Sequence, residues 1–270
     1  MLKYYFFIVI FLINSIAFSD SEEDLNNLNN FNQCIECNFS NMDLKGVKFW
    51  NANINNSNFN GANLTKANFQ GANFSNSLFI EAVLIKANLQ SANLDNTNFQ
   101  DAKIIATNFI GATLIKAKLN NVEIRGSNMQ SIDFIDGEAI GSNMKSTNFT
   151  GANLSNTNLS NSDFTGSDFS GANLTEVDFS GANLKNVNFS GTNLTNANFE
   201  GAFLIGTKFI MSNLSNISFE STDLKHAIFE DIFFCGKKRH GEIRFSSILD
   251  GIITENKQDQ AYVLKSLSCK

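Results

Sequence analysis

The chain has 270 residues, enough for one or two domains with a sizeable core. Its formal net charge is −6 at pH 7, which excludes a general attraction to nucleic acids or anionic membranes. The composition is unusual, because 27 Phe stand beside one Trp and three Tyr, and proline is absent.

The first 19 residues, MLKYYFFIVIFLINSIAFS, have the pattern of a secretory signal peptide. A lysine precedes an apolar run, and Ala17 and Ser19 are the small residues expected before cleavage at Asp20. A membrane-spanning helix needs about 20 apolar residues, and this run ends at Asn14. The sequence therefore predicts export to the periplasm or the medium, in soluble form after cleavage. The alternative is that the segment is retained as an anchor.

From Phe39 to Phe234, a large apolar residue recurs at every residue number that ends in 4 or 9. We call this position the centre of a pentapeptide. Of the 40 centres, 39 are Phe, Leu, Ile or Met, and only Ala139 is small. Because no insertion or deletion breaks the register, the period of five must be structural.

The other positions of the pentapeptide are also restricted. Two residues before the centre, 36 of the 40 positions carry Ala, Ser, Thr, Val, Gly or Cys, which indicates a tight interior. One residue before the centre, Asn or Asp fills 27 of 40 places. Two residues after it, Gly or Asn fills 24 of 39 places, and these residues best tolerate the positive φ of a type II turn. Each pentapeptide is therefore predicted to be a short extended edge followed by a turn.

Such a unit cannot bury its own apolar side chain, so the chain must coil and stack on itself. Stacked coils pair backbone groups from rung to rung, and a proline would remove one of the donors, which accounts for its absence. Phe occupies 15 of the 20 centres ending in 9, and Leu 12 of the 20 ending in 4. This alternation favours an even number of sides. Four sides would give two opposed Phe columns and two opposed Leu columns.

The stretches GANLTKANFQGANF and GANLSNTNLSNSDFTGSDFSGANL resemble the A(D/N)LxX motif of pentapeptide-repeat proteins, and the resemblance extends over residues 39–234. It implies an all-β fold, a right-handed quadrilateral β-helix with 20 residues per coil. Here that means about ten coils over about 48 Å. The predicted segments are a signal peptide (1–19), a linker or N-terminal cap (20–33), the β-helix (34–234) and a small C-terminal cap (235–270).

Four cysteines flank the repeat. Cys34 and Cys37 form a CxxC that resembles the one opening the first coil in exported members of the family. A zinc site needs four ligands, and no His or second CxxC is near, so a disulfide or two buried thiols is the better interpretation. Cys235 and Cys269 are candidates for a second disulfide, because cysteines at opposite ends of a solenoid cannot meet. We predict no metal and no cofactor.

Two further motifs each have a functional and a structural interpretation. DFIDGEAI, residues 133–140, gathers three carboxylates beside Ala139. The spacing matches no known Ca²⁺ loop, so a local bulge or a filled gap is the better interpretation. KKRH, residues 237–240, suits either an acidic partner or a solvated turn, and we favour the turn.

The position after each centre should point outward, and Ile residues gather there in one part of the chain. Seven of them form the candidate interaction surface: Ile80, Ile85, Ile105, Ile110, Ile115, Ile135 and Ile140. With 20 residues per coil, Ile85 lies beside Ile105, and Ile115 beside Ile135 on the opposite side. Grouped outward apolar residues favour an unidentified protein partner or self-association.

The sequence favours a non-enzymatic structural or protein-binding scaffold acting outside the cytoplasm. Neither His226 nor His240 lies in a catalytic or metal-ligand pattern, and the pair Glu123 and Arg125 lacks a third member. A carbohydrate-active β-helix enzyme is therefore a remote alternative. The family resemblance supplies a closer one, a DNA-mimicking inhibitor or modulator of a type II topoisomerase. An export signal weighs against it, so we expect no nucleic-acid partner, and no membrane contact after signal removal.

Overall fold

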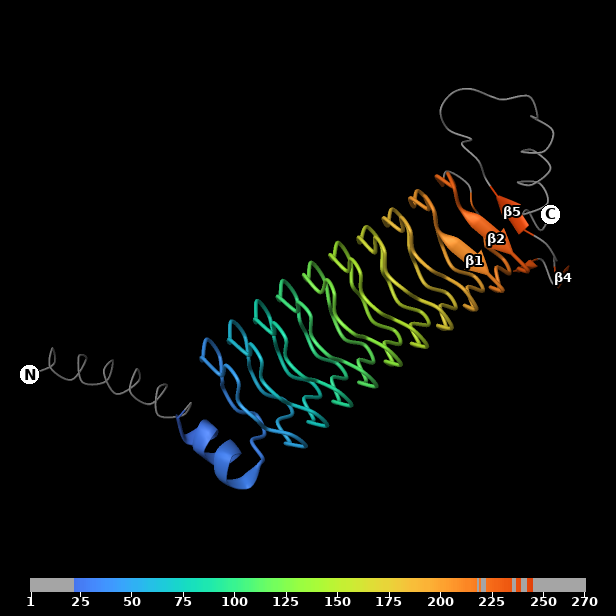
Figure 1. Cartoon of the computed structure of the whole chain (residues 1–270). Helices are drawn as coiled ribbons and strands as arrows, with labels where there is room; N and C mark the ends of the chain where they lie inside the picture. Colours follow the sequence, from blue (N-terminus) through green and yellow to red (C-terminus); the bar gives the residue numbers. More distant parts are fainter. Residues whose placement is uncertain (1–21, 218, 220–221, 235–236, 239–241, 245–270) are drawn as a thin grey trace, which may run out of the picture.

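The computed structural model describes residues 22–217, 219, 222–234, 237–238 and 242–244. A helix over residues 22–31 leads into an elongated solenoid whose coils stack along one axis (Figure 1). Within these ranges, every helix is too short or too polar to cross a lipid bilayer. The predicted signal peptide and its cleavage site lie outside the described residues.

Each coil contains 20 residues. The residue before a centre forms a parallel bridge with the residue 20 positions later, from Gln33 with Asn53 to Asn213 with Phe233. Four pentapeptides therefore make one coil, and each centre lies above the centre four repeats earlier. This pairing confirms the predicted quadrilateral β-helix.

The turns between the sides have the predicted backbone conformation. Every described position two residues after a centre, from Asn41 to Asp231, has a positive φ. Gly61 and Asn76 have φ values of 67° and 60°, and even Lys66 reaches 59°. A lysine in this left-handed region is costly in isolation, so the ladder on both sides of the turn must enforce the conformation.

In a pentapeptide such as residues 59–63, all five backbone N–H groups have acceptors. Two donate to the following coil, one to the preceding coil, one closes the turn, and one reaches a side chain. In pentapeptide 59–63 the pairs are Phe59 to Leu78 O (2.7 Å), Asn60 to Asn58 Oδ1 (3.0 Å), Gly61 to Ile80 O (2.8 Å), Ala62 to Phe59 O (3.0 Å) and Asn63 to Met42 O (2.9 Å). A proline would remove a bonded donor at any of the five positions, which extends the predicted reason for its absence.

Asn and Asp before the centre have two roles that the sequence analysis did not identify. The side-chain oxygen accepts a hydrogen bond from the N–H two residues later and so holds the turn. Where Asn recurs in successive coils, its amide also donates to the residue one coil earlier, as Asn108 Nδ2 does to Asn88 Oδ1 at 3.0 Å. The polar position of the motif therefore stabilises both the turn and the stack.

The core consists of four columns of centres. The rings of Phe59 and Phe79 stack with centroids 4.9 Å apart, one coil after the other. Across the core, Phe179 meets Phe189 of the opposite side edge to face at 5.8 Å. Two opposed Phe columns are thus present, as the alternation predicts. One is interrupted by three non-aromatic centres: Leu119, Ala139 and Leu159.

The small centre Ala139 does not break the coil. Glu138 bridges to Lys118 on one side and to Asn158 on the other, so the register continues without a bulge. Gly137, two residues before Ala139, also faces the core. A Cβ at Gly137 would clash with the ring of Phe134, which is almost fully buried. The structure thus favours the filled gap over the bulge, with the Phe134 ring in the volume that two small residues leave open.

The C-terminal end is closed by antiparallel strands. β1 (Lys208–Ile210) pairs in parallel with β2 (Ile228–Glu230), and β5 (Glu242–Arg244) adds antiparallel to β2. Likewise β3 (Phe233–Phe234) pairs antiparallel with β4 (Lys237–Lys238). Each added strand covers a ladder edge that would otherwise stay open. The first two residues of the KKRH motif thus lie in a strand, and the other two lie outside the described residues.

Candidate functional site

The N-terminal end carries the one group of converging metal-ligand side chains found in the described part of the chain: Asp24, Cys34 and Cys37. Residues 22–31 form a helix, which the sequence analysis did not predict, and Leu28 of that helix is buried in the core. The Asp24 carboxylate accepts a hydrogen bond from the N–H of Asn38 at 2.8 Å. The helix is therefore fixed to the start of the solenoid by one apolar and one polar contact.

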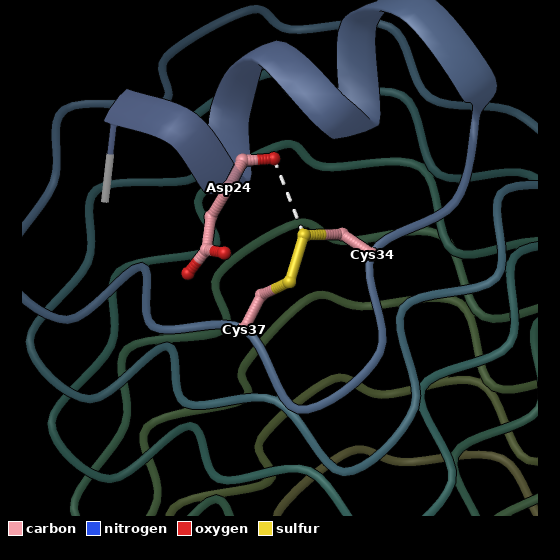
Figure 2. Close-up of side chains that lie close together, drawn as sticks. All are labelled: Asp24, Cys34 and Cys37. Carbon is pink, nitrogen blue, oxygen red and sulfur yellow. Dashed lines mark hydrogen bonds between the residues drawn. A yellow bond between two sulfur atoms is a disulfide. The ribbon is translucent and has the colours of Figure 1, made fainter. Parts of the chain in front are cut away.

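Cys34 and Cys37 are joined by a disulfide, one of the two states that the sequence predicts (Figure 2). Both residues are buried, and Cys34 Sγ lies 3.2 Å from the carbonyl oxygen of Asp24. Because disulfide sulfurs carry no negative charge, they do not act as metal ligands, and Asp24 alone makes no site. The arrangement joins the turn of the first coil to the helix above it. Cys235 and Cys269 lie outside the described residues, so their pairing stays a prediction.

The seven outward Ile residues do not form one face. They are all half-buried, and they occupy all four corners of the solenoid. The structure brings Ile85 beside Ile105 at one corner and Ile115 beside Ile135 at the opposite corner, because residues 20 apart are neighbours. Ile80, Ile110 and Ile140 lie at the other two corners. The candidate surface is therefore two separate pairs with three flanking residues.

The most exposed apolar side chains are other residues. Phe31, Trp50, Phe203 and Met211 are each more than half exposed. Phe31 and Trp50 lie near the start of the solenoid, where Asn32 Nδ2 donates to the carbonyl of Trp50 at 3.1 Å. The position after the centre could have identified Trp50, but only Ile residues were selected there.

The ionisable groups considered for catalysis are in ordinary surroundings. Arg125 Nε lies 2.8 Å from Glu123 Oε1 in a surface ion pair on one side of the solenoid. His226 is an exposed turn residue with a φ of 58°, and His240 lies outside the described residues. The three carboxylates of residues 133–140 do not converge, since Asp136 accepts from Asn156 Nδ2 and Glu138 pairs with Lys118.

Asp163 has a perturbed environment. Burial alone would raise the pKa of its carboxyl, but the hydroxyl and N–H of Thr165 and the ammonium of Lys145, at 3.1 Å, together lower the pKa. The charged form of Asp163 is thus stabilised by the fold.

Buried serine hydroxyls form a feature that the sequence analysis missed. Ser142 Oγ accepts a hydrogen bond from the N–H of Val122 at 3.2 Å and donates one to the carbonyl of Leu119 at 2.6 Å. The hydroxyl thus replaces the direct turn bond of the preceding coil. The same bridge is made by Ser57, Ser77, Ser127, Ser162 and Ser167. The sequence contained the information needed to find these bridges. Each bridging serine stands two residues before a centre, 20 residues after the N–H that it accepts.

Comparison with known proteins agrees with this architecture. A family model described as "Pentapeptide repeat region" matches residues 52–129, and one described as "Pentapeptide repeats (8 copies)" matches 33–61, 142–181 and 172–210. No curated protein sequence matches the chain.

Solved structures share the fold. HetL, a pentapeptide repeat protein involved in heterocyst differentiation regulation in the cyanobacterium Nostoc sp. strain PCC 7120, superposes with a TM-score of 0.63 at 20% identity. That match covers 80% of this chain and 97% of HetL. The plasmid-mediated fluoroquinolone resistance protein QnrB1, in a trypsin-treated form, matches over 60% of this chain and 81% of its own at 21% identity. Its TM-score of 0.38 is too low to support an argument.

The repeat models together extend over most of the residues between 33 and 210, and the fold that they imply is the fold observed. The chain belongs to the pentapeptide-repeat family.

Proposed function

We propose that the protein is a non-enzymatic binding scaffold that acts outside the cytoplasm. The observation that carries this proposal is the straight, repeated presentation of outward side chains on a backbone whose coils are hydrogen-bonded to one another. Such a rod can hold a partner at fixed points along its length without rearranging. The two Ile pairs at opposite corners are the contact points that we propose for that partner. The N-terminal signal pattern and the Cys34–Cys37 disulfide support action in an oxidising compartment.

The proposed localisation outside the cytoplasm is tested by intact-mass measurement of the protein recovered from its native cells. Export with cleavage requires a mature chain that begins at Asp20. A mature chain that still carries residues 1–19 would contradict both the cleavage and the proposed compartment.

The binding role is tested by cross-linking and affinity capture from the same compartment with a triple variant, Ile105→Ser, Ile110→Ser and Ile115→Ser. The core stays unchanged, so the β-rich circular dichroism spectrum should persist while the captured partner is lost. A matched variant at the same outward position, Gln70→Ser, Gln90→Ser and Gln130→Ser, should retain the partner. If the two variants and the wild type capture the same set of proteins, the Ile residues are surface without a binding role.

A further inference from the structure

The coil length of 20 residues sorts the charged side chains onto two opposite edges of the solenoid. We define the basic edge as residues 43–48 and the equivalent segments at intervals of 20, up to 223–228. The acidic edge is residues 33–41 and its equivalents up to 193–201. Positions ten residues apart lie on opposite sides of a 20-residue coil, so the two edges face in opposite directions.

The basic edge carries ten of the twelve Lys and Arg residues between residues 33 and 231. These are Lys45, Lys48, Lys66, Lys86, Lys103, Arg125, Lys145, Lys185, Lys208 and Lys225. Five acidic residues share this edge: Asp43, Glu123, Asp163, Asp168 and Asp223. The excess of positive charge is hidden in the composition, because the whole chain is acidic.

The acidic edge has the opposite balance. It holds ten acidic residues: Glu36, Glu81, Asp95, Asp101, Asp133, Asp136, Glu138, Glu176, Asp178 and Glu200. Only Lys116 and Lys118 are basic on this edge, and Lys118 pairs with Glu138 at 3.5 Å. The solenoid is therefore polar across its width, with a positive and a negative side.

The two edges are also matched coil by coil. We divide residues 33–212 into nine segments of 20 residues, one coil each. In six of the nine, the two edges carry net charges of opposite sign, and in none do they carry the same sign. In the other three coils one edge is neutral. Residues 53–72 carry only Lys66, and the coil with Lys116 and Lys118 has the neutral pair Glu123 and Arg125 on its other edge. The coil with Asp163 and Asp168 has an uncharged acidic edge.

We infer that these edges are the two halves of one contact, and that the partner is a second copy of this chain. In this contact the basic edge of one copy lies along the acidic edge of the next. The copies are side by side, point the same way and have no offset along the axis. Single surface ion pairs contribute little, but a row of matched charges selects the orientation and register of association.

The contact is heterologous, because two different surfaces meet. Each added copy therefore offers a fresh basic and a fresh acidic edge, and association continues sideways into an open row. Ile85 and Ile105 lie on the basic edge, and Ile115 and Ile135 lie on the acidic edge, so this contact also covers the two Ile pairs. The inference goes beyond the proposed function, since it requires neither export nor the Ile pairs.

Sedimentation velocity at about 20 mM and about 500 mM NaCl tests the contact, because the higher salt concentration screens the attraction between exposed charges. The wild type should associate with rising concentration in low salt and sediment as a monomer in high salt. A wild type that stays monomeric in low salt at the highest attainable concentration overturns the inference.

Charge reversal tests which residues are responsible. One variant reverses three exposed residues of the basic edge, Lys66→Glu, Lys86→Glu and Lys185→Glu. The other reverses the acidic edge, Glu36→Lys, Glu138→Lys and Glu176→Lys. Each variant alone should associate at least about tenfold more weakly than the wild type, because three reversed residues reduce or abolish the charge difference between its two edges. Mixing the two variants should restore pairing, because the unaltered acidic edge of the first variant meets the unaltered basic edge of the second. A control, Gln70→Glu, Gln90→Glu and Gln130→Glu, adds charge outside both edges and should still associate. If the control variant also fails to associate, net charge and not the position of the charges causes the loss of association, and the inference is overturned.

The register is tested by cysteine cross-linking in low salt. Lys86 and Asn76 lie on opposite edges of the same coil. In the proposed row, a Lys86→Cys copy should therefore form a disulfide with an Asn76→Cys copy. A copy with Asn156→Cys, four coils farther along the same edge, should react at least about tenfold less. Equal cross-linking at both positions would show attraction without register and contradict the proposed contact.

Discussion

At the scale of single residues, position within the pentapeptide decides the energetic role. Phe179 is fully buried and stacks on Phe199 with ring centroids 5.4 Å apart. Its neighbour Ser180 points outward and is half-buried, and its backbone is bonded on both sides, the N–H to Asp178 Oδ1 and the carbonyl to the N–H of Asn161. Adjacent residues thus differ entirely in what their side chains contribute.

We predict that Phe179→Ala lowers the free energy of unfolding by about 3–5 kcal/mol, because it opens a cavity in the Phe column. Ser180→Ala should change it by less than about 0.5 kcal/mol. Urea unfolding curves of the two variants provide the measurement. Equal shifts in the midpoint would mean that the aromatic column is not a main source of stability.

The second residue-scale prediction concerns pH. Because the folded pKa of Asp163 is lowered below its unfolded value of about 3.9, the charged carboxylate stabilises the fold above that pH. This contribution is lost as the pH falls through the folded pKa. Asp163→Asn should therefore be less stable than the wild type at neutral pH, by up to about 1 kcal/mol. The difference should shrink towards zero as the carboxyl becomes protonated in both states.

Thermal unfolding of both proteins at a series of pH values measures the difference. Lys145→Gln is the control, because it removes the ammonium but leaves the bonds from Thr165, and so should give part of the same effect. A gap between wild type and Asp163→Asn that stays constant with pH would contradict the assigned cause.

At the scale of the element, the turn has two forms, and a serine of the next coil selects between them. Where the small residue of the next coil lacks a hydroxyl, the turn closes on itself, as in the bond from Ala62 N–H to the Phe59 carbonyl. Where serine is present, as in Ser142, the hydroxyl enters the turn below. Ser212 is different, since its buried Oγ has no partner among the residues that the structure describes.

We predict that Ser142→Ala costs about 1–2 kcal/mol of unfolding free energy, because the N–H of Val122 and the carbonyl of Leu119 lose their shared partner. Ser212→Ala is the matched control at an equivalent small position, and it should be neutral or slightly stabilising, because a buried unbonded hydroxyl is removed. Denaturant titration of both variants decides the matter. If Ser142→Ala is as neutral as Ser212→Ala, the turn simply recloses and the hydroxyl bridge has no net value.

The sequence predicted the repeat, the inward centres and the positive φ of turn residues such as Asn76, because each leaves a local pattern every five residues. It did not predict the serine bridges or the asparagine ladders, whose partners are about 20 residues apart and become neighbours only once the coil length is known. The N-terminal helix was missed for a different reason. Its apolar anchors, the buried Leu28 and the partly buried Leu25, are too few to give a helical period in a polar segment. The seven Ile residues were grouped because they are close in the sequence. The corner of the solenoid on which each one lies depends instead on its position within the 20-residue coil.

At the scale of the whole molecule, the coil length connects the core to the surface. Removing four pentapeptides leaves every column and both charged edges in register. Removing two pentapeptides still stacks Phe on Phe, because the two Phe columns are ten residues apart. Removing two pentapeptides also rotates all later residues by half a coil. The basic edge before the deletion is then in line with the acidic edge after it.

We predict that deletion of residues 150–169 and deletion of residues 150–159 both leave a cooperatively unfolding β-helix. In each, the urea m value should fall only in proportion to the residues removed. The longer deletion should keep salt-dependent self-association, and the shorter one should weaken it about tenfold or more, although it removes less of the chain. Circular dichroism and sedimentation in low salt measure the two properties separately. If the shorter deletion variant associates as strongly as the wild type, self-association does not depend on the alignment of the charged edges along the solenoid.

The hydrogen bonding of the backbone amides has a consequence for proton exchange with solvent. In a pentapeptide such as residues 59–63, four of the five N–H groups are bonded to backbone carbonyls within the ladder or the turn, and the fifth is bonded to a side-chain oxygen at the surface. In deuterated water, the amide after each centre should therefore exchange first, and the other four should wait for larger openings of the stack. Along the rod, one fast amide should recur for every four slow ones. Where a serine bridge enters a turn, the small residue of that turn should join the faster class.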